Sequence, residues 1–400
     1  MATNQINSGY LANLTPLRGM AALIVLLFHF DLFWGGPFAG TLFSTDTTLF
    51  VKKGYLLVDF FFVLSGLIMC HVYGASFIGS VQRAGFWQFM KARFARIYPL
   101  HLFTLVWAVL LFAAIVYTNF PLNEREKSVY DLRAIPANLG LFHAMGLYPG
   151  YTWNGPSWTI SVEWWMYAAF PFLYGPVARL TNWGRAAMLT GLLGGYVVLV
   201  YVLNTFPQFP WHHSLNVPPF MGAAFLRCVL SFSVGMVFHG LFRQQWAKSW
   251  LANGYATVGF TVAVAVSMHL GLSDIITVAT FPFIILSAGY GSVNVNKVLI
   301  TKPMQRLGDL SFSIYLTNEI IFNSGRVVRH ALGLPLKPEN VSHAGVWLWC
   351  IGWLAVVILI SELTYRFIEL PARQALNARF KKPVVREMAV SELQWHRPSD

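Results

Sequence analysis

The chain has 400 residues, of which 56% are hydrophobic and only 11% are charged. A soluble domain of this length carries about 25% charged residues, so an ordinary water-soluble fold is excluded and a bilayer must solvate the apolar runs. The net charge is +12. It does not indicate nucleic acid, because the basic residues fall between apolar runs, where they set topology and contact membrane lipids. The 3 cysteines lie inside apolar runs, so we expect no disulfide framework and no metal site.

Ten apolar segments have about the length needed to cross a bilayer, which takes about 20 residues. We therefore predict an all-α polytopic membrane protein with about ten transmembrane helices. These helices cover approximately residues 14–34, 55–76, 98–119, 158–178, 186–205, 222–243, 250–270, 275–292, 309–330 and 345–368. Lys and Arg are more frequent on the side that holds both termini, so we expect both termini in the cytoplasm. Residues 1–373 then form the transmembrane domain, and residues 374–400 form a basic and polar cytoplasmic tail.

The first predicted helix contains Arg18 and His29. Eleven residues make close to three helical turns, so both side chains point to nearly the same face, roughly 16 Å apart along the axis. This arrangement suits a ligand with an anionic head at the membrane surface and a reactive end at depth. Because an imidazole titrates near neutral pH, His29 is a natural general base. The alternatives are a topological anchor for Arg18 and a hydrogen-bonded packing residue for His29.

The second predicted helix carries Asp59 within a strongly apolar stretch. A carboxylate there could orient an imidazole and fix its tautomer. Alternatively, Asp59 pairs with Lys52 or Lys53 at the outer surface. The following Ser65 and Gly66 indicate a close helix contact rather than a nucleophile.

Arg93 and Arg96 precede the third predicted segment and share one helix face, because they are three residues apart. Paired guanidinium groups bind phosphates in a bidentate manner. The pattern therefore predicts a phosphate site. The alternative is a basic cluster that contacts lipid headgroups.

The fourth predicted helix begins near Ser157 and carries Glu163 among Trp and Tyr residues. A carboxylate beside aromatic faces suits the binding of a hydroxyl acceptor, or proton transfer. The alternative is a glutamate in a structural hydrogen-bond network. Arg227 in the sixth helix and Glu319 in the ninth are expected to form a buried structural pair, and the alternative is that both line the same cavity. No phosphate-binding loop, dinucleotide fingerprint or serine-nucleophile elbow is present, which argues against nucleotide-driven pumping and serine-hydrolase chemistry.

In these elements the sequence resembles the acyltransferase 3 family of integral membrane O-acyltransferases. The resemblance covers roughly residues 10–375. It is carried by the basic residue and histidine of the first helix, an Arg-x-x-Arg element and a Ser-x-Glu element. The matching segments are Leu14–His29, Gly54–Gly66, Arg93–Arg96, Pro156–Glu163, Leu307–Leu316 and Phe367–Arg373. Three positions depart from the family pattern: Thr15 replaces a common Asp, Thr159 replaces the first Ser of a Trp-Ser-x-Ser-x-Glu element, and Asn318 replaces a common His.

The resemblance implies acyl transfer from cytoplasmic acyl-CoA to an acceptor at or beyond the outer surface. Arg18 and His29 would be the essential pair, and Arg93 and Arg96 would bind the CoA donor. Ser161 and Glu163 would belong to an active-site motif. The donor is expected to be acetyl-CoA and the acceptor a carbohydrate or lipid-linked glycan of the cell envelope. The expected location is the bacterial inner membrane, with no metal and no nucleic acid involved.

Several questions stay open from sequence alone. His29 could act as a general base or carry the acyl group transiently. A transporter of acyl groups or glycans would also have ten helices and buried charges, and so would a non-catalytic membrane sensor. The acyl chain, the acceptor and the oligomeric state are not determined by the sequence.

Overall fold

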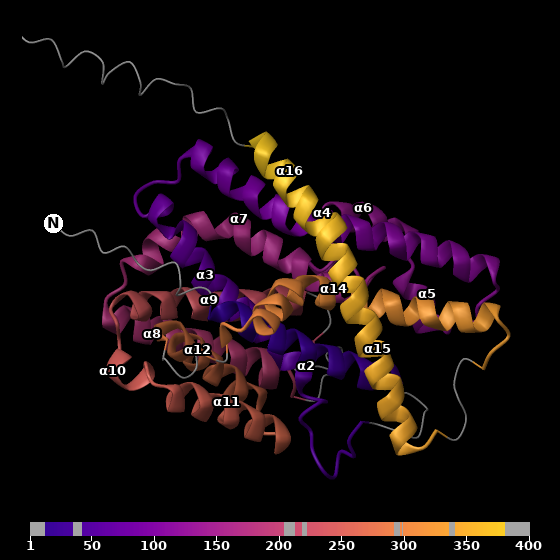
Figure 1. Ribbon diagram of the computed structural model, residues 1–400. Helices are drawn as coiled ribbons and strands as arrows, with labels where there is room; N and C mark the ends of the chain where they lie inside the picture. The colour runs from indigo at the N-terminus through magenta and orange to yellow at the C-terminus, as the bar shows by residue number, and fades with distance from the viewer. Residues whose placement is uncertain are drawn as a thin grey trace, which may run out of the picture.

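The computed structural model describes residues 13–34, 42–203, 213–217, 222–291, 297, 299–335 and 341–380. Within these ranges the chain forms helices and no strand (Figure 1). The ten longer helices that correspond to the predicted spans are α2 (Leu14–Trp34), α3 (Leu57–Tyr73), α4 (Arg83–Tyr117), α7 (Trp158–Ala178), α8 (Asn182–Val197), α9 (Ala223–Arg243), α11 (Gly254–His269), α12 (Asp274–Tyr290), α14 (Lys302–Ala331) and α15 (His343–Thr364). The predicted all-α polytopic class is therefore confirmed.

Short helical pieces join or extend the long helices. They are η1 (Gly54–Leu56), η2 (Gly74–Phe77), α5 (Glu124–Val129), η3 (Leu132–Ala134), α6 (Ile135–Leu139), η4 (Gly155–Ser157), η5 (Val198–Val202), α10 (Lys248–Leu251), η8 (Tyr365–Glu369) and α16 (Leu370–Phe380). Two of them, η5 and η8, are π-helical turns that continue α8 and α15. Most of the predicted tail, residues 381–400, lies outside the described residues.

Six helical stretches are long and apolar enough to cross a membrane by themselves. They are Leu14–Trp34, Gly54–Phe77, Arg83–Tyr117, Asn182–Val202, Ala223–Arg243 and His343–Phe380. The helices α11 and α12 are apolar but shorter. That α7, α11, α12 and α14 also cross the membrane stays a prediction.

The relative directions of packed helices agree with a chain whose successive spans cross the membrane in opposite directions. Gly19 in α2 abuts Gly308 in α14, and ten residues further on His29 lies beside Asn318, so α2 and α14 run parallel. The helices α11 and α12 are antiparallel, because one hydrogen bond joins Thr257 to Ser287 and another joins Ser267 to Thr277. The first and ninth predicted spans must run parallel in a ten-span chain, and the seventh and eighth must be antiparallel.

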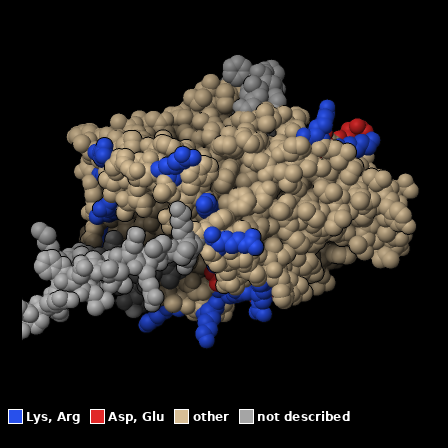
Figure 2. All heavy atoms as spheres, turned by 90° about the horizontal axis from the view of Figure 1, so that it is seen from above, with Lys and Arg blue, Asp and Glu red and all other residues tan. Residues whose placement is uncertain are grey.

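The outer surface of the bundle is largely apolar. Side chains such as Leu110 on α4 and Leu348 and Leu359 on α15 are at least 60% exposed. Lipid accepts such residues, whereas water would make them aggregate. Figure 2 shows wide uncharged areas on one face, where Lys and Arg side chains outnumber Asp and Glu.

Two helices begin earlier than the hydropathy predicts. The helix α4 starts at Arg83 rather than near residue 98, and α14 starts at Lys302 rather than near residue 309. Both added segments are rich in polar and basic residues, which an interfacial helical turn can carry while its backbone hydrogen bonds stay intact. The extension of α4 brings Arg93 onto a regular helix that packs inside the bundle.

Candidate active site

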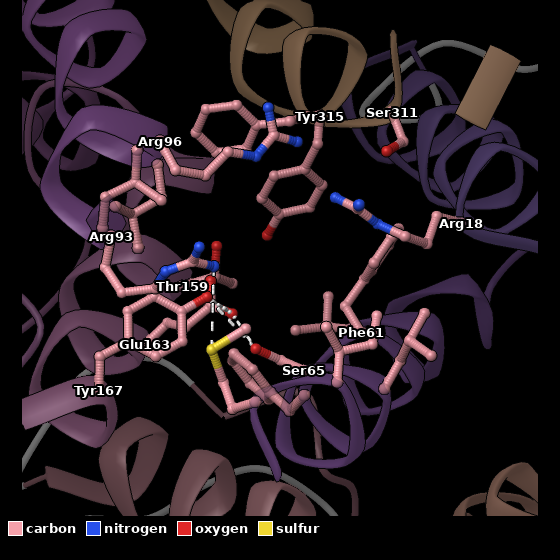
Figure 3. A pocket seen from close by; sticks show the side chains of 18 residues that line it. Arg18, Phe61, Ser65, Arg93, Arg96, Thr159, Glu163, Tyr167, Ser311 and Tyr315 are labelled. Atoms are coloured by element: carbon pink, nitrogen blue, oxygen red, sulfur yellow. Dashed lines mark hydrogen bonds between the residues drawn. The ribbon is translucent and has the colours of Figure 1, made fainter. Parts of the chain in front are cut away.

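A cavity of about 150 Å³ lies inside the bundle, in the half that holds the N-terminal ends of α2, α4 and α14. Its wall comes from α2, α3, α4, α7 and α14, so segments from most of the chain meet there. Figure 3 shows the labelled side chains arranged around the hollow. Arg18, Arg93, Arg96 and Glu163 supply the ionisable groups of the lining, together with the hydroxyls of Tyr167 and Tyr315.

Three guanidinium groups converge on this cavity from two sides. Arg18 enters from α2, and Arg93 and Arg96 enter from α4 on the opposite wall (Figure 3). Within the described part of the chain, Arg18 and Arg93 form no ion pair. A guanidinium that is buried without a counterion is costly. These three arginines therefore line one cavity, and Arg18 and Arg93 stay available to an anionic ligand.

Arg93 is fixed by aromatic and sulfur contacts rather than by a carboxylate. Its Nη2 atom donates to the hydroxyl of Tyr73 at 2.5 Å, and its guanidinium lies 4.7 Å from the centre of that ring. A second nitrogen approaches the sulfur of Met69 at 3.8 Å. The Nε atom of Arg93 is buried and has no hydrogen-bond partner in the described structure. This side chain is thus held in place with unused donor capacity.

Arg96 forms an ion pair with Glu369 at the far end of the chain. Glu369 lies in the π-helical turn η8, and its other oxygen accepts a hydrogen bond from Ser313 at 3.1 Å. Single π-helical turns are frequent at functional sites because they turn a side chain away from the regular helical register. The turn therefore places a carboxylate against the arginine that lines the cavity.

Glu163 is the acidic member of the cavity wall. Its Oε1 atom accepts hydrogen bonds of 2.6 Å from both Ser65 and Tyr167. The two hydroxyls also lie 3.3 Å from each other. Electrostatic attraction links this carboxylate to Arg18 across the cavity. The close helix contact predicted for Ser65 and Gly66 is confirmed for Gly66, which abuts the backbone of Phe232. Ser65 instead faces the cavity.

His29 lies beyond the cavity, separated from it by Tyr315. Its ring stacks on Phe33 at 5.6 Å and lies 6.4 Å from the ring of Tyr315, whose hydroxyl points into the hollow (Figure 3). The side chain of Asn318 is close enough to interact with the imidazole. Even so, the Nδ1 atom of His29 and the Oδ1 atom of Asn318 lack a hydrogen-bond partner among the described residues. The imidazole therefore faces protein, and one ring nitrogen is unused.

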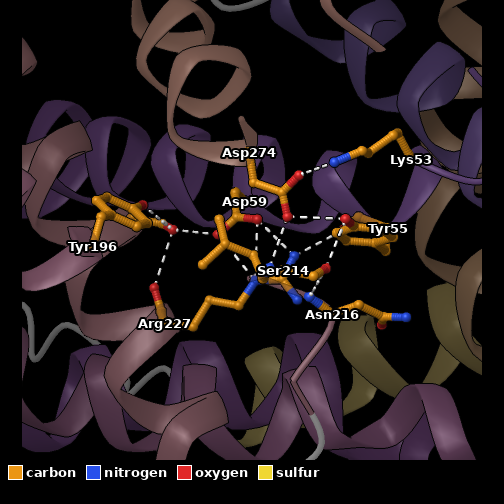
Figure 4. Close-up of polar contacts among 10 residues, drawn as sticks. Lys53, Tyr55, Asp59, Tyr196, Ser214, Asn216, Arg227 and Asp274 are labelled. Carbon is orange, nitrogen blue, oxygen red and sulfur yellow. Dashed lines mark hydrogen bonds and ion pairs between the residues drawn. The ribbon is translucent and has the colours of Figure 1, made fainter. Parts of the chain in front are cut away.

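Asp59 does not contact the imidazole. Its carboxylate accepts hydrogen bonds from Nε and Nη2 of Arg227, the shortest at 2.6 Å, and from Ser231 at 2.7 Å (Figure 4). Both charged side chains are almost fully buried. The suggested orienting role of Asp59 is thus wrong in this structure, because a guanidinium and a hydroxyl already occupy both carboxylate oxygens.

The other expected ion pairs are rearranged as well. Lys53 pairs with Asp274 at 2.5 Å, not with Asp59. Glu319 is not paired with Arg227, but lies against the backbone of Gly155 in the turn before α7. The expected Arg227–Glu319 pair is therefore wrong. Sequence position alone did not show that Asp59 of α3 is the partner of Arg227.

Ser161 points away from the cavity. Its hydroxyl donates to the carbonyl of Leu141 at 2.8 Å and accepts from the amide of Ala144 at 3.1 Å. It therefore anchors the segment before α7 rather than contacting the arginines. In this segment His143 contacts the Ser157 hydroxyl at 3.0 Å, and burial, with the nearby His101, lowers the pKa of His143 to about 3. Ser157 occupies the N-cap position of α7, but its hydroxyl donates to the carbonyl of Asn154 and makes no capping hydrogen bond.

Sequence reasoning missed several residues that line or support the site. Tyr167 and Tyr315 line the cavity, Ser311 presents a buried hydroxyl without a hydrogen-bond partner in the described structure, and Glu369 holds Arg96. A helical-spacing argument could have found two of them, because Tyr167 is four residues after Glu163 and Tyr315 is four after Ser311. No local signal identifies Glu369, since its partner is distant in sequence. Among the described residues, no cluster of three or more His, Cys, Asp or Glu could hold a metal ion.

The bundle and its internal cavity define a polytopic membrane protein with a positively charged internal site. Residues 11–366 match the acyltransferase domain that characterises the acyltransferase 3 family. Because this match covers most of the chain, the chain belongs to the acyltransferase 3 family. No solved structure shows a significant match to it.

Relatives of this chain are named acyltransferases or O-acetyltransferases. The chain is 27% identical to acyltransferase MdmB of Streptomyces mycarofaciens, over 92% of this chain and 93% of the relative. It is 21% identical to the peptidoglycan O-acetyltransferase OatA of Listeria monocytogenes and 23% identical to O-acetyltransferase OatA of Staphylococcus aureus. In both of these proteins the matched region spans 57% of the relative's length.

Proposed function

We propose that this protein transfers an acyl group, acetyl by default, from cytoplasmic acyl-CoA to a hydroxyl of a cell-envelope carbohydrate. The observation that carries the proposal is the convergence of Arg18, Arg93 and Arg96 on one buried cavity that ends at Tyr315, with His29 behind it. Two relatives are named O-acetyltransferases, and one of them is named for peptidoglycan. These names support a hydroxyl acceptor on a carbohydrate.

The proposed donor fits the charge of the cavity. The CoA phosphates are anionic, and guanidinium groups bind phosphate oxygens through paired N–H donors. Pockets that enclose a drug-sized ligand have volumes of about 300–1,000 Å³, so a cavity of about 150 Å³ takes only part of an acyl-CoA. We assign it the thioester and its pantetheine arm, with Arg93 and Arg96 at the phosphate end.

The proposed chemistry uses His29 as general base, and it requires the Tyr315 ring to move aside so that the imidazole reaches the cavity. The imidazole removes the proton of the acceptor hydroxyl, the oxygen attacks the thioester carbon, and the carbon–sulfur bond breaks. The CoA thiolate then takes the proton from the imidazolium, so atoms and charge balance. Tyr315, whose hydroxyl points into the cavity, would donate a hydrogen bond to the oxyanion. In a second route His29 attacks the thioester itself and carries the acyl group to the acceptor.

The proposed location is the bacterial inner membrane, with the arginine end of the cavity toward the cytoplasm. Acyl-CoA is a cytoplasmic metabolite, and Arg18 lies near the N-terminal end of α2, which charge distribution predicts to be cytoplasmic. His29 lies about three turns deeper along the same helix. The site would thus receive the donor from inside and present the acyl group toward the acceptor side.

Reconstituted protein tests this proposal directly. Vesicles that contain the purified protein are given acetyl-CoA on one side and soluble cell-wall glycan fragments on the other. Release of the CoA thiol is followed with a thiol reagent, and the fragments are weighed by mass spectrometry. We expect thiol release that depends on both substrates and a mass increase of one acetyl group. Glycan movement without thiol release would identify a transporter and overturn the proposal.

A further inference from the structure

A second cavity, of about 290 Å³, lies between the C-terminal ends of α7 and α9 and the N-terminal end of α8. It shares no lining residue with the arginine cavity described above. Its polar lining includes Arg185, Arg243, His239 and Tyr174, and no Asp or Glu contributes to it. The proposed acyl transfer does not use it.

Arg185 is the residue that makes this cavity unusual. It is only 7% exposed, and a side-chain carbon at position 240 would come within 2.8 Å of its Nε atom. Glycine at position 240 therefore lets the guanidinium lie directly against the backbone of α9. Its Nη1 atom donates a hydrogen bond to the uncharged side-chain oxygen of Asn182 at 3.0 Å. A guanidinium has five N–H donors, and this amide contact leaves the charge of Arg185 without a counterion at the cavity wall.

A second guanidinium, that of Arg243, strengthens the positive character of this cavity. Arg243 contacts the hydroxyl of Tyr174. His239 is buried, with its ring 6.0 Å from the ring of His71. Neither Arg185 nor Arg243 forms an ion pair in the described ranges. A buried cation without a counterion is unfavourable, and a bound anion would supply the missing counterion to Arg185.

We propose that this cavity binds a phosphate group, carried either by an anionic phospholipid or by a soluble phosphate ester. Guanidinium pairs recognise phosphate oxygens in a bidentate manner. The cavity lies at the end of the bundle that charge distribution predicts to face the cytoplasm, at the level of lipid headgroups. Phe172 on α7 and Leu193 on α8 are exposed at 59% and 48%, so two helices that line the cavity also present apolar surface to acyl chains.

Native mass spectrometry of the full-length protein in detergent tests the proposal. The protein is incubated with dioleoyl-phosphatidylglycerol, with dioleoylglycerol, which has the same chains and no phosphate, and with glycerol phosphate. The variants are Arg185→Gln, Arg243→Gln and the control Arg179→Gln. Arg179 is exposed at the same end of the bundle and lies outside the cavity lining.

We expect one saturable phosphatidylglycerol adduct, with affinity at least tenfold weaker in Arg243→Gln and in Arg185→Gln, and unchanged in Arg179→Gln. Dioleoylglycerol should give no such adduct. Binding of glycerol phosphate with the same dependence on Arg185 and Arg243 would support the soluble source instead. Equal binding of both lipids would overturn the proposal, and so would wild-type affinity in Arg243→Gln. Because Arg243 is exposed, this second variant keeps the test valid if Arg185→Gln fails to fold.

Discussion

Arg18 and His29 lie on the same helix, but the structure gives them different surroundings. Arg18 lines the cavity, whereas His29 contacts Phe33 and Tyr315 behind it. The spacing in the sequence predicted a shared face, and the neighbours of α2 decide which part of that face borders the cavity. Asn318, which departs from the family pattern, lies beside the imidazole. The departure therefore concerns the immediate partner of the proposed base.

Replacement of Arg93 or Arg96 by Gln should raise the apparent KM for acetyl-CoA about tenfold or more. A hydrogen bond to a charged group contributes about 1.5–3 kcal/mol, which corresponds to about one to two orders of magnitude in binding. The measurement is a donor titration at saturating acceptor. Arg83→Gln is the matched control, because Arg83 is exposed on the same helix and outside the cavity lining. Unchanged donor titrations in both cavity variants would remove these arginines from donor binding.

Replacement of Asp59 by Asn should destabilise the protein by about 3–5 kcal/mol, because Arg227 would keep a buried charge without its counterion. Reversible unfolding in mixed micelles measures this loss. The double variant Asp59→Asn with Arg227→Met should recover part of it, since the uncompensated cation is then gone. If the double variant is less stable than the single one, the pair has another role.

Local sequence indicated Arg18, Arg93, Arg96 and Glu163 as candidate site residues, because a charged side chain in or beside an apolar run is costly without a partner or a ligand. It did not identify the partner of each charge. Asp59, Arg227, Lys53 and Asp274 form their pairs between helices that are distant in sequence, and helix packing alone determines these pairs. A buried charge is thus predictable from one sequence, whereas its counterion is not.

At the scale of elements, close helix contacts position the site. Gly19 and Gly308 bring α2 against α14, next to Arg18 and Ser311, and Gly66 brings α3 against the backbone of α9. Small residues allow such approach in membrane bundles, where van der Waals packing drives helix association. The cavity therefore depends on residues that do not line it.

Replacement of Gly66 by Leu should prevent the contact between α3 and α9 and abolish the folded state in detergent. The added side chain would collide with the backbone of Phe232, which cannot move away as a flexible side chain could. Size-exclusion chromatography and the thermal unfolding midpoint measure the effect. Gly191→Leu on α8 is the control, because a side chain there meets no atom within 4 Å. A Gly66→Leu protein that elutes and melts like the wild type would refute this packing.

Hydropathy predicted that the ten longer helices exist and gave their order along the chain. It misplaced the starts of α4 and α14, because polar turns that continue a helix beyond its apolar run carry no hydropathy signal. It also gave no sign of the π-helical turn η8, which places Glu369 against Arg96. Such turns depend on packing rather than on composition.

At the scale of the whole molecule, the site is asymmetric along the direction of the helices. Three arginines occupy the end where α2, α4 and α14 begin, and His29 lies deeper along α2. This polarity has functional meaning only if that end faces the cytoplasm. The direction of transfer thus depends on the topology.

Cysteine labelling tests the topology. A cysteine at position 83 should react with a membrane-impermeant maleimide only in inverted vesicles, and one at position 127 only in right-side-out cells. Both positions are exposed, and the native cysteines Cys70, Cys228 and Cys350 are buried, so the background is expected to be low. Labelling of positions 83 and 127 from the same side would contradict the predicted arrangement.

The most direct measurement of the central claim is acetyl transfer in inverted membrane vesicles that receive radiolabelled acetyl-CoA on the exposed cytoplasmic face. Label in the glycan fraction is compared for wild type, His29→Ala and the control His213→Ala, whose exposed histidine lies in another part of the chain. The account predicts label for wild type and His213→Ala and none for His29→Ala at equal abundance in the membrane. Wild-type turnover in His29→Ala would contradict the account.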